Sequence, residues 1–233
     1  MVKRAIFGDI HGHYDSFYEL YKKENPDEVI LLGDYVDSFT KTPKECQQCL
    51  MNLLDLKKQH NEEGGKFIML LGNHDFHYIF NGEYYSGYKI ETQQLCGNIL
   101  KSAVIEDKDI IPIYVDNNII FSHAGVTNTW MTLHNLKLED VNKIDSMRDL
   151  HKFRFTGWNI YGDDPKNSPI WVRPNSLIND MYGDYKQIVG HTHTYTPLTD
   201  LNFIAIDTMP DYYIVQELEN SKVINETIIN NTK

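Results

Sequence analysis

Five short polar clusters constrain the fold of this chain more than any other feature of its sequence. Each contains a glycine near an Asp, Asn or His, and each follows directly on a short apolar run. Glycine permits a sharp turn, so the next side chain can point beyond the end of a strand. The clusters are Gly8-Asp9-Ile10-His11-Gly12, Gly33-Asp34-Tyr35-Val36-Asp37, Gly72-Asn73-His74-Asp75, Ser122-His123-Ala124-Gly125 and Gly190-His191-Thr192-His193. Polar side chains at strand ends are typical of functional sites in α/β folds.

The apolar runs alternate with helical patterns in the first half of the chain. Strands are expected at residues 2–7, 29–32, 67–71, 110–115, 119–121, 187–189, 203–206, 212–218 and 222–229, with a hairpin turn at 116–118. Helices are expected after the first cluster, over residues 91–101, and from Thr42, where Pro43 and Glu45 complete a capping box. The order predicts a layered α/β fold. We expect one domain over residues 1–233, with an irregular inserted subregion at about 126–186.

Charge and cysteine content narrow the class of protein. The net charge of −11 is not that of a typical nucleic-acid binder, so nucleic acid is a disfavoured partner, although not an excluded one. No apolar run approaches the ~20 residues of a membrane span, and three cysteines do not suggest a disulfide framework. We therefore expect a cytoplasmic protein. Cys46 and Cys49 fall on the apolar stripe of one helix, which favours a core role over a metal or redox role.

The five clusters together supply the ligand types of a two-metal site. Such a site needs imidazoles, carboxylates, one carboxylate that can bridge, and neutral oxygens. Taken singly, an Asp after a strand is more often a turn residue or a helix cap, and a histidine is more often a hydrogen-bonding partner. The repetition of one pattern at five strand ends favours metal binding.

As an ordered set, the clusters resemble the signature of the calcineurin-like metallophosphoesterases. The similarity spans residues 8–193 and is greatest to compact bacterial and phage members of the serine/threonine-phosphatase branch. It implies an α/β/β/α sandwich with the site at the C-terminal ends of the strands. It also implies two divalent metal ions. Because the ligand set lacks a thiolate, manganese is the first expectation, with iron or zinc as alternatives.

The resemblance assigns a role to each matching residue. Asp34 would bridge the two metals. His74 would be the general acid, oriented by Asp37, and Arg173 together with Asn73 would bind the substrate phosphate. The remaining ligands would be Asp9 and His11 for the first metal, and Asn73, His123 and His191 for the second. Metal-bound hydroxide would attack phosphorus while His74 protonates the leaving oxygen.

Two departures from the family pattern leave the substrate open. Ser38 stands where the phosphatase branch has an arginine, and His193 stands where compact phosphatases often have proline. In the phosphodiesterase and nuclease branches the second histidine of this motif binds the first metal, so His193 is a further candidate ligand. We expect a phosphomonoesterase acting on a phosphoprotein or a small phosphorylated molecule. The alternatives are a phosphodiesterase or pyrophosphohydrolase acting on nucleotides, dinucleotide polyphosphates or nucleic acid, and a non-catalytic binding module. The oligomeric state stays open.

Overall fold

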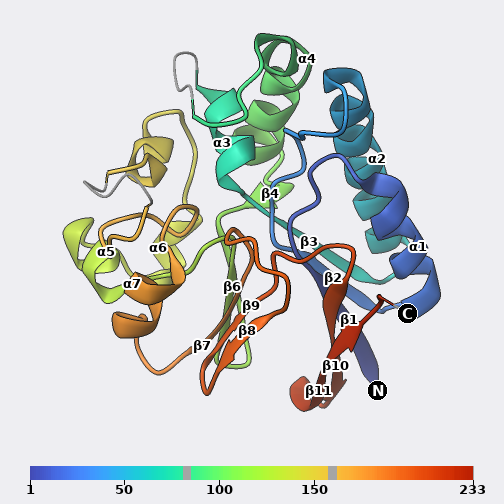
Figure 1. Cartoon of the computed structure of the whole chain (residues 1–233). Coiled ribbons are helices and arrows are strands. Elements are labelled where there is room, and N and C mark those ends of the chain that lie inside the picture. Colours follow the sequence, from blue (N-terminus) through green and yellow to red (C-terminus); the bar gives the residue numbers. More distant parts are fainter. Residues whose placement is uncertain (81–84, 157–161, 233) are drawn as a thin grey trace.

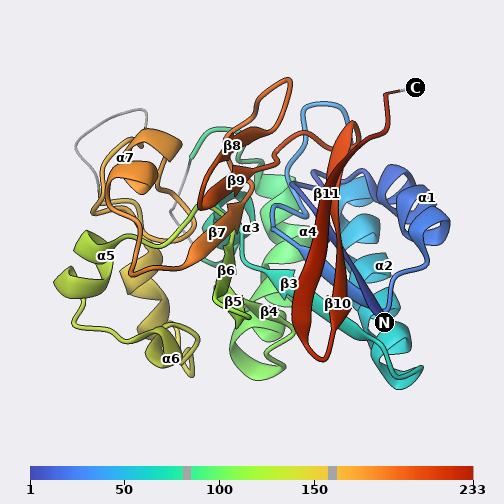
Figure 2. The ribbon, with the colours of Figure 1, turned by 90° about the horizontal axis from the view of Figure 1, so that it is seen from below.

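The computed structural model describes residues 1–80, 85–156 and 162–232. Two β-sheets pack face to face, and helices lie against the outer side of each sheet (Figure 1). Figure 2 shows the same layers from below, with α1, α2 and α4 beside the first sheet and α5 to α7 beside the second. The layered α/β/β/α fold is thereby confirmed.

The first sheet holds the strands that carry the N-terminal clusters. Its order is β11-β10-β1-β2-β3-β4, in which β1 to β4 are parallel, β10 is antiparallel to β1, and β11 is antiparallel to β10. Its strands are β1 (Val2–Phe7), β2 (Glu28–Leu31), β3 (Lys66–Leu70), β4 (Ile110–Ile111), β10 (Tyr212–Glu219) and β11 (Lys222–Asn230). The helices of this half are α1 (Tyr14–Glu24), α2 (Pro43–Glu62), α3 (Asn73–Ile79) and α4 (Ile90–Lys101), which continues into a π-helical turn over Ser102–Glu106.

The second sheet holds the strands that carry the C-terminal clusters. Its order is β5-β6-β7-β9-β8, with β6, β7 and β9 parallel. Its strands are β5 (Ile113–Asp116), β6 (Ile119–Ser122), β7 (Lys186–Val189), β8 (Leu198–Asp200) and β9 (Phe203–Ala205). Between β6 and β7 lie α5 (Asn128–Leu133), α6 (Leu138–Val141), a 3-10 turn (Asp149–Phe153) and α7 (Pro174–Asn179). The expected insertion at 126–186 therefore contains short helices.

The alternation of side chains along a strand explains how one strand contributes to two apolar cores. In β1, Ala5 and Phe7 pack into the core between the sheet and its helices. Ile6 points the other way and joins Phe121 and Ile188 in the core between the two sheets. Successive side chains of a strand alternate between faces, so a strand buried on both sides is apolar throughout.

Several local predictions can be compared directly with the structure. The capping box of Thr42 and Glu45 is present, and both Cys46 and Cys49 are buried with free thiols, as expected. The prediction of one strand over 110–115 is wrong. The chain pairs with β3 in the first sheet up to Ile111 and then with β6 in the second sheet from Ile113, with Pro112 between the two pieces. Proline has no N–H for a ladder, so it suits this change of sheet.

The expected hairpin turn is confirmed between β5 and β6. Asp116 pairs with Ile119, and the two residues between them, Asn117 and Asn118, have φ angles of 50° and 63°. Two consecutive positive φ angles characterise the tight turn that asparagine favours. Of the helices in the described part of the chain, none combines the length and apolar character needed to cross a membrane.

Candidate metal centre

The five clusters converge because each follows the C-terminal end of a parallel strand. Asp9 follows β1, Asp34 follows β2, and Asn73 begins α3 directly after β3. His123 and His191 follow β6 and β7 of the facing sheet. The two sheets therefore contribute the candidate donors from opposite sides.

The turns that present these side chains are held in an unusual backbone conformation. The φ angles of His11, Asp34, Asp37 and His191 are 45°, 53°, 71° and 66°. Residues with a side chain rarely adopt positive φ, and such residues cluster at functional sites, where the surrounding structure imposes the conformation. Glycine is needed beside them for close approach: a Cβ on Gly72 would lie 2.0 Å from Asp34 Oδ1.

The donor atoms of Asn73, His123 and His191 point at one another. The side-chain oxygen Oδ1 of Asn73 lies 2.8 Å from both His123 Nε2 and His191 Nδ1. The other ring nitrogen of each histidine faces a main-chain carbonyl, Leu32 for His123 and Trp171 for His191. A carbonyl can only accept, so those nitrogens carry the protons, and in a neutral ring the nitrogens that face Asn73 present lone pairs. The lone pairs of Asn73 Oδ1, His123 Nε2 and His191 Nδ1 therefore converge, as the ligands of one cation would.

The charges around His123 support the same conclusion. Its Nε2 lies 3.4 Å from Asp34 Oδ2, and its Nδ1 lies 3.9 Å from Asp9 Oδ1. Burial lowers the pKa of His123, but the two carboxylates raise it to about 10. By contrast, burial and the nearby His123 and Arg173 hold the pKa of His191 well below its usual range, so that ring is neutral. The buried carboxylates of Asp9 and Asp34 thus draw a proton onto His123, and a metal cation would stabilise their negative charge in the same way.

A second group of donors surrounds Asp9 and His11. Ligand atoms of Asp9, His11 and Asp34 all lie within 4.8 Å of one another. His11 Nδ1 donates to the main-chain carbonyl of Asp37 at 2.7 Å, which leaves Nε2 as the ligating atom, 3.8 Å from Asp34 Oδ2. Asp34 thus faces both groups, as a bridging carboxylate must. The residues present therefore fit two metal ions.

Asp75 belongs to the third cluster but has a supporting position. It is fully buried, and its carboxyl group accepts hydrogen bonds from the main-chain N–H groups of Asp34, Tyr35, Val36 and Gly72. Burial, and then the charge of Asp34, raise the pKa of Asp75 to about 7. These hydrogen bonds fix the turn that carries Asp34, so Asp75 holds the loop and does not itself face the donor groups.

His74 and Asp37 form a hydrogen-bonded pair at the edge of the centre. His74 Nδ1 lies 2.7 Å from Asp37 Oδ2, and the main-chain N–H of His74 donates to Asp34 Oδ1 at 2.9 Å. Burial lowers the pKa of His74, but Asp34 and Asp37 together raise it above the ordinary value. Both side chains line a cleft of about 400 Å³, together with His11, Ser38, Phe39, His193 and Asp207. A proton held on Nε2 of His74 would therefore be available to a molecule in this cleft.

Arg173 lies at the border of the centre, where it also lines a neighbouring cavity. Its Nη1 donates to the His191 carbonyl and to Thr192 Oγ1, each at 3.1 Å. The neighbouring cavity, of about 590 Å³, includes Trp171 and Phe155 in its walls. The guanidinium is half-buried next to His191, a position consistent with the predicted phosphate contact.

The two positions that depart from the family pattern, Ser38 and His193, both line the cleft. Ser38 is buried, and its hydroxyl accepts from the main-chain N–H groups of Thr40 and Lys41, so it closes its own turn. His193 has a side chain that is 74% exposed, and its Nδ1 lies 3.9 Å from Asp207 Oδ2. In the described part of the chain, the group of Asp9, His11 and Asp34 does not include His193. Its role as a ligand stays a prediction.

Two residues at the centre were not singled out from the sequence. Asp207 follows β9 and is largely buried, and it faces His193. Its signal was an apolar run that ends in an acid, the same pattern as in the clusters but without the glycine. His77 is fully buried one helical turn after His74. The i, i+3 spacing of the two histidines was the available signal.

The chain was compared with known proteins. The sequence model of the calcineurin-like phosphoesterases matches residues 2–199. No curated protein matches the chain.

Solved structures with this fold include a protein serine/threonine phosphatase from Saccharomyces cerevisiae, at 16% identity and a TM-score of 0.57, covering 100% of this chain and 81% of that one. A metallophosphoesterase from Sphaerobacter thermophilus aligns at 12% identity and a TM-score of 0.50, over 98% and 87% of the two chains. A putative diadenosine tetraphosphatase aligns at 14% identity and a TM-score of 0.46, over 99% and 95%. At such low identity these likenesses concern the fold alone.

Proposed function

Because the chain belongs to the calcineurin-like phosphoesterases, we propose that it hydrolyses phosphomonoesters at a two-metal centre. The observation that carries the proposal is one juxtaposition. The converging donors of Asn73, His123 and His191 adjoin Asp34, and the hydrogen-bonded His74–Asp37 pair adjoins the same carboxylate. Hydrolysis requires a site for an attacking water and a proton donor for the leaving oxygen, and this arrangement provides both.

The donor set indicates which residues would hold the metals. Asn73, His123 and His191 would hold one ion, Asp9 and His11 the other, and Asp34 both. When bound, two divalent cations activate water near neutral pH and withdraw charge from phosphate oxygens. Imidazole, carboxylate and amide donors without a thiolate suit manganese, with iron or zinc as alternatives. We propose manganese as the activating ion.

The chain's own residues control the proton for the leaving group. Asp37 accepts from Nδ1 of His74, which fixes the proton on that nitrogen and leaves Nε2 as the atom that delivers a proton. The Asp37 carboxylate also stabilises the protonated ring. Alkoxide leaving groups depart poorly without such a proton, so His74 matters most for esters of ordinary alcohols.

Charge balance favours an anionic substrate. Asp9, Asp34 and Asp207 supply three carboxylates at the centre, whereas two divalent cations and the guanidinium of Arg173 would supply five positive charges. This surplus of positive charge would favour binding of an anionic phosphate ester. Asn73 and Arg173 are the proposed contacts to the phosphate oxygens, Arg173 through a geometry suited to two parallel hydrogen bonds.

Diester or pyrophosphate hydrolysis is the second candidate, and the observation that favours it is the orientation of Ser38. Its hydroxyl closes a turn with Thr40 and Lys41, so this position supplies no second guanidinium to a dianionic phosphate. A site with one arginine would discriminate less strongly in favour of monoesters.

A substrate panel with manganese separates the two candidates. We expect kcat/KM for p-nitrophenyl phosphate and a phosphopeptide to exceed that for bis-p-nitrophenyl phosphate and a diadenosine polyphosphate by about tenfold, which corresponds to about 1.4 kcal/mol. A preference for the bis ester or the dinucleotide would overturn the monoester assignment and establish the second candidate.

A further inference from the structure

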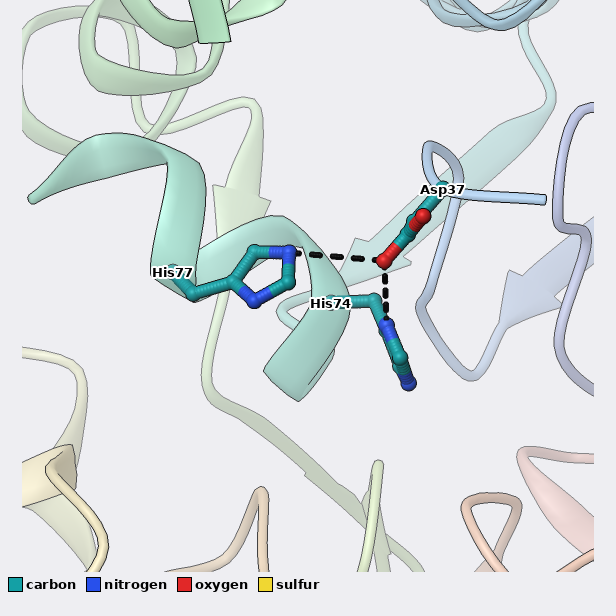
Figure 3. Close-up of side chains that lie close together, drawn as sticks. All are labelled: Asp37, His74 and His77. Carbon is teal, nitrogen blue, oxygen red and sulfur yellow. Dashed lines mark hydrogen bonds and ion pairs between the residues drawn. The ribbon is translucent and has the colours of Figure 1, made fainter. Parts of the chain in front are cut away.

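His77 shares the Asp37 carboxylate with His74. The two histidines are three residues apart on α3, so their side chains lie on the same side of the helix, towards the loop that follows β2 (Figure 3). Asp37 Oδ2 lies 2.7 Å from His74 Nδ1 and 3.5 Å from His77 Nε2. One carboxylate oxygen therefore faces two imidazoles.

Among the described residues, aromatic rings surround His77, and the Asp37 carboxylate lies next to one of its ring nitrogens. His77 is fully buried, and among the described residues neither ring nitrogen has a hydrogen-bond partner at normal distance. A buried polar ring without a partner is costly, so the 3.5 Å approach to a carboxylate is its main electrostatic compensation. The rings of Tyr78, Tyr85 and Tyr88 lie 4.2 to 6.2 Å from it and hold its orientation.

The same segment closes the remaining side of Asp37. Gly87, at φ 89°, approaches so closely that a Cβ there would lie 2.4 Å from Asp37 Oδ2. The carboxylate oxygen is thus enclosed by His74, His77 and the backbone that also carries Tyr85 and Tyr88. Small shifts of His77 would be passed to Asp37, because close-packed groups cannot move independently.

Charge supports this arrangement. Burial lowers the pKa of His77, and Asp37 only partly opposes that effect. A neutral imidazole with its proton on Nε2 would direct an N–H towards the carboxylate, 3.5 Å away, without competing with the proton on His74. Among the described residues, the charged and titratable groups that face His77 are Asp37 from the β2 loop, His74 and Tyr78 from α3, Asp34 at longer range, and Tyr85 and Tyr88 from the segment before α4.

We propose that His77 is a positioning residue for the general acid: it holds Asp37 Oδ2 and, through it, the orientation and the Nδ1-protonated form of His74. His77 does not itself face the cleft. Outer residues of this kind are typically worth 10- to 100-fold in activity when their partner is a catalytic or ligating group. The proposal rests on the proposed function only in its assignment of His74 as the acid.

The test compares two substitutions at His77. His77→Phe keeps a ring of similar volume but removes the N–H, and we expect kcat on a poor leaving group, such as an alkyl phosphate, to fall by about tenfold. The loss on p-nitrophenyl phosphate is expected to be much smaller, because that leaving group needs little protonation. His77→Gln, which can place an N–H near the position of Nε2, is expected to recover most of the loss. Metal content and KM should not change.

A matched control separates positioning from general destabilisation. His60 is also a buried histidine, on α2, bonded to Tyr21 and the Asp27 carbonyl. His60→Phe should lower stability without altering the dependence on leaving group. In the background of Asp37→Asn, His77→Phe should have no further effect on kcat, because its action passes through that carboxylate.

Two results would overturn the proposal. The first is an equal loss on good and poor leaving groups, since a residue that acts through the acid must affect poor ones more. The second is a fall in bound metal in His77→Phe, which would make Asp37, His74 and His77 a ligand group instead. If the wild type prefers diesters, the proposed function fails, but the same comparison can then be made with aryl and alkyl diesters.

Discussion

The two halves of the proposed metal centre differ in how far their histidine side chains are exposed to solvent. Around Asn73, the rings of His123 and His191 are buried, and each is fixed by a main-chain carbonyl behind it. Around Asp9, the ring of His11 is also held by a main-chain carbonyl, but its side chain is 33% exposed and lines the open cleft. The histidines of the first half are closed to solvent, whereas His11 in the second is partly open to it. We therefore expect the Asn73 half to bind its metal ion more tightly.

The largest expected effect comes from the residue that the halves share. Asp34 Oδ2 lies 3.4 Å from His123 Nε2 and 3.8 Å from His11 Nε2. Asp34→Asn should weaken both metal positions and lower kcat by roughly 10³-fold, because bound metals contribute several kcal/mol to the transition state. Steady-state kinetics on p-nitrophenyl phosphate, with metal analysis of the same samples, measure both effects. Asp145→Asn, at an exposed carboxylate, is the control. Near-normal activity in Asp34→Asn would refute its bridging role.

A matched pair of substitutions tests the difference between the halves. His123→Asn removes a fully buried proposed ligand, and we expect a loss of about 10²-fold that extra manganese does not restore, because water cannot readily take its place. His11→Asn removes a partly exposed proposed ligand, which a water molecule could replace. Its activity should recover to within about tenfold of the wild type at high manganese. Manganese titrations of the two variants provide the comparison. Equal recovery would show that the halves do not differ.

A third prediction concerns stability, and here we expect a gain where the preceding predictions expect a loss of activity. Burial, and then the charges of Asp207 and Asp34, raise the pKa of Asp9, so the ionised form destabilises the metal-free fold. Asp9→Asn should therefore raise the unfolding free energy of EDTA-treated protein by about 1 kcal/mol, or the melting temperature by about 2–4 °C, although it weakens metal binding. Thermal unfolding with and without manganese measures both changes. A lower melting temperature in EDTA would contradict the expected charge repulsion.

The smallest expected effect is at His193. Its side chain extends into solvent 3.9 Å from Asp207, so His193→Ala should change kcat/KM by less than about threefold, or less than 1 kcal/mol. A loss as large as that of His11→Asn at low manganese would instead show that metal loading brings His193 into the first metal's ligand set, as the family resemblance suggests.

Structural features that depend on neighbouring residues could be predicted from the sequence. Asp9, Asp34 and Asn73 each end an apolar run, and the convergence of parallel strand ends follows from the alternation of strands and helices. The capping box at Thr42 is also a short-range signal. Such features depend on residues a few positions apart, which is why the pattern alone indicates them.

The parts that could not be predicted depend on contacts between distant segments. From the sequence alone, His77 cannot be distinguished from an ordinary core histidine. Only the fold shows that Asp37, 40 residues earlier in the chain, lies beside it in the loop that follows β2. The turn around Ser38 uses its hydroxyl internally, a fact that no alignment of motifs reveals. The division of residues 110–115 between two sheets depends on which strands lie beside them.

The central claim is that two metal ions share Asp34, and metal analysis tests it most directly. The wild-type protein and Asp34→Asn would be loaded with manganese, freed of excess ion and assayed for bound metal per chain. We predict about two equivalents in the wild type and fewer than one in the variant. One equivalent in the wild type, unchanged by Asp34→Asn, would contradict the shared two-metal centre.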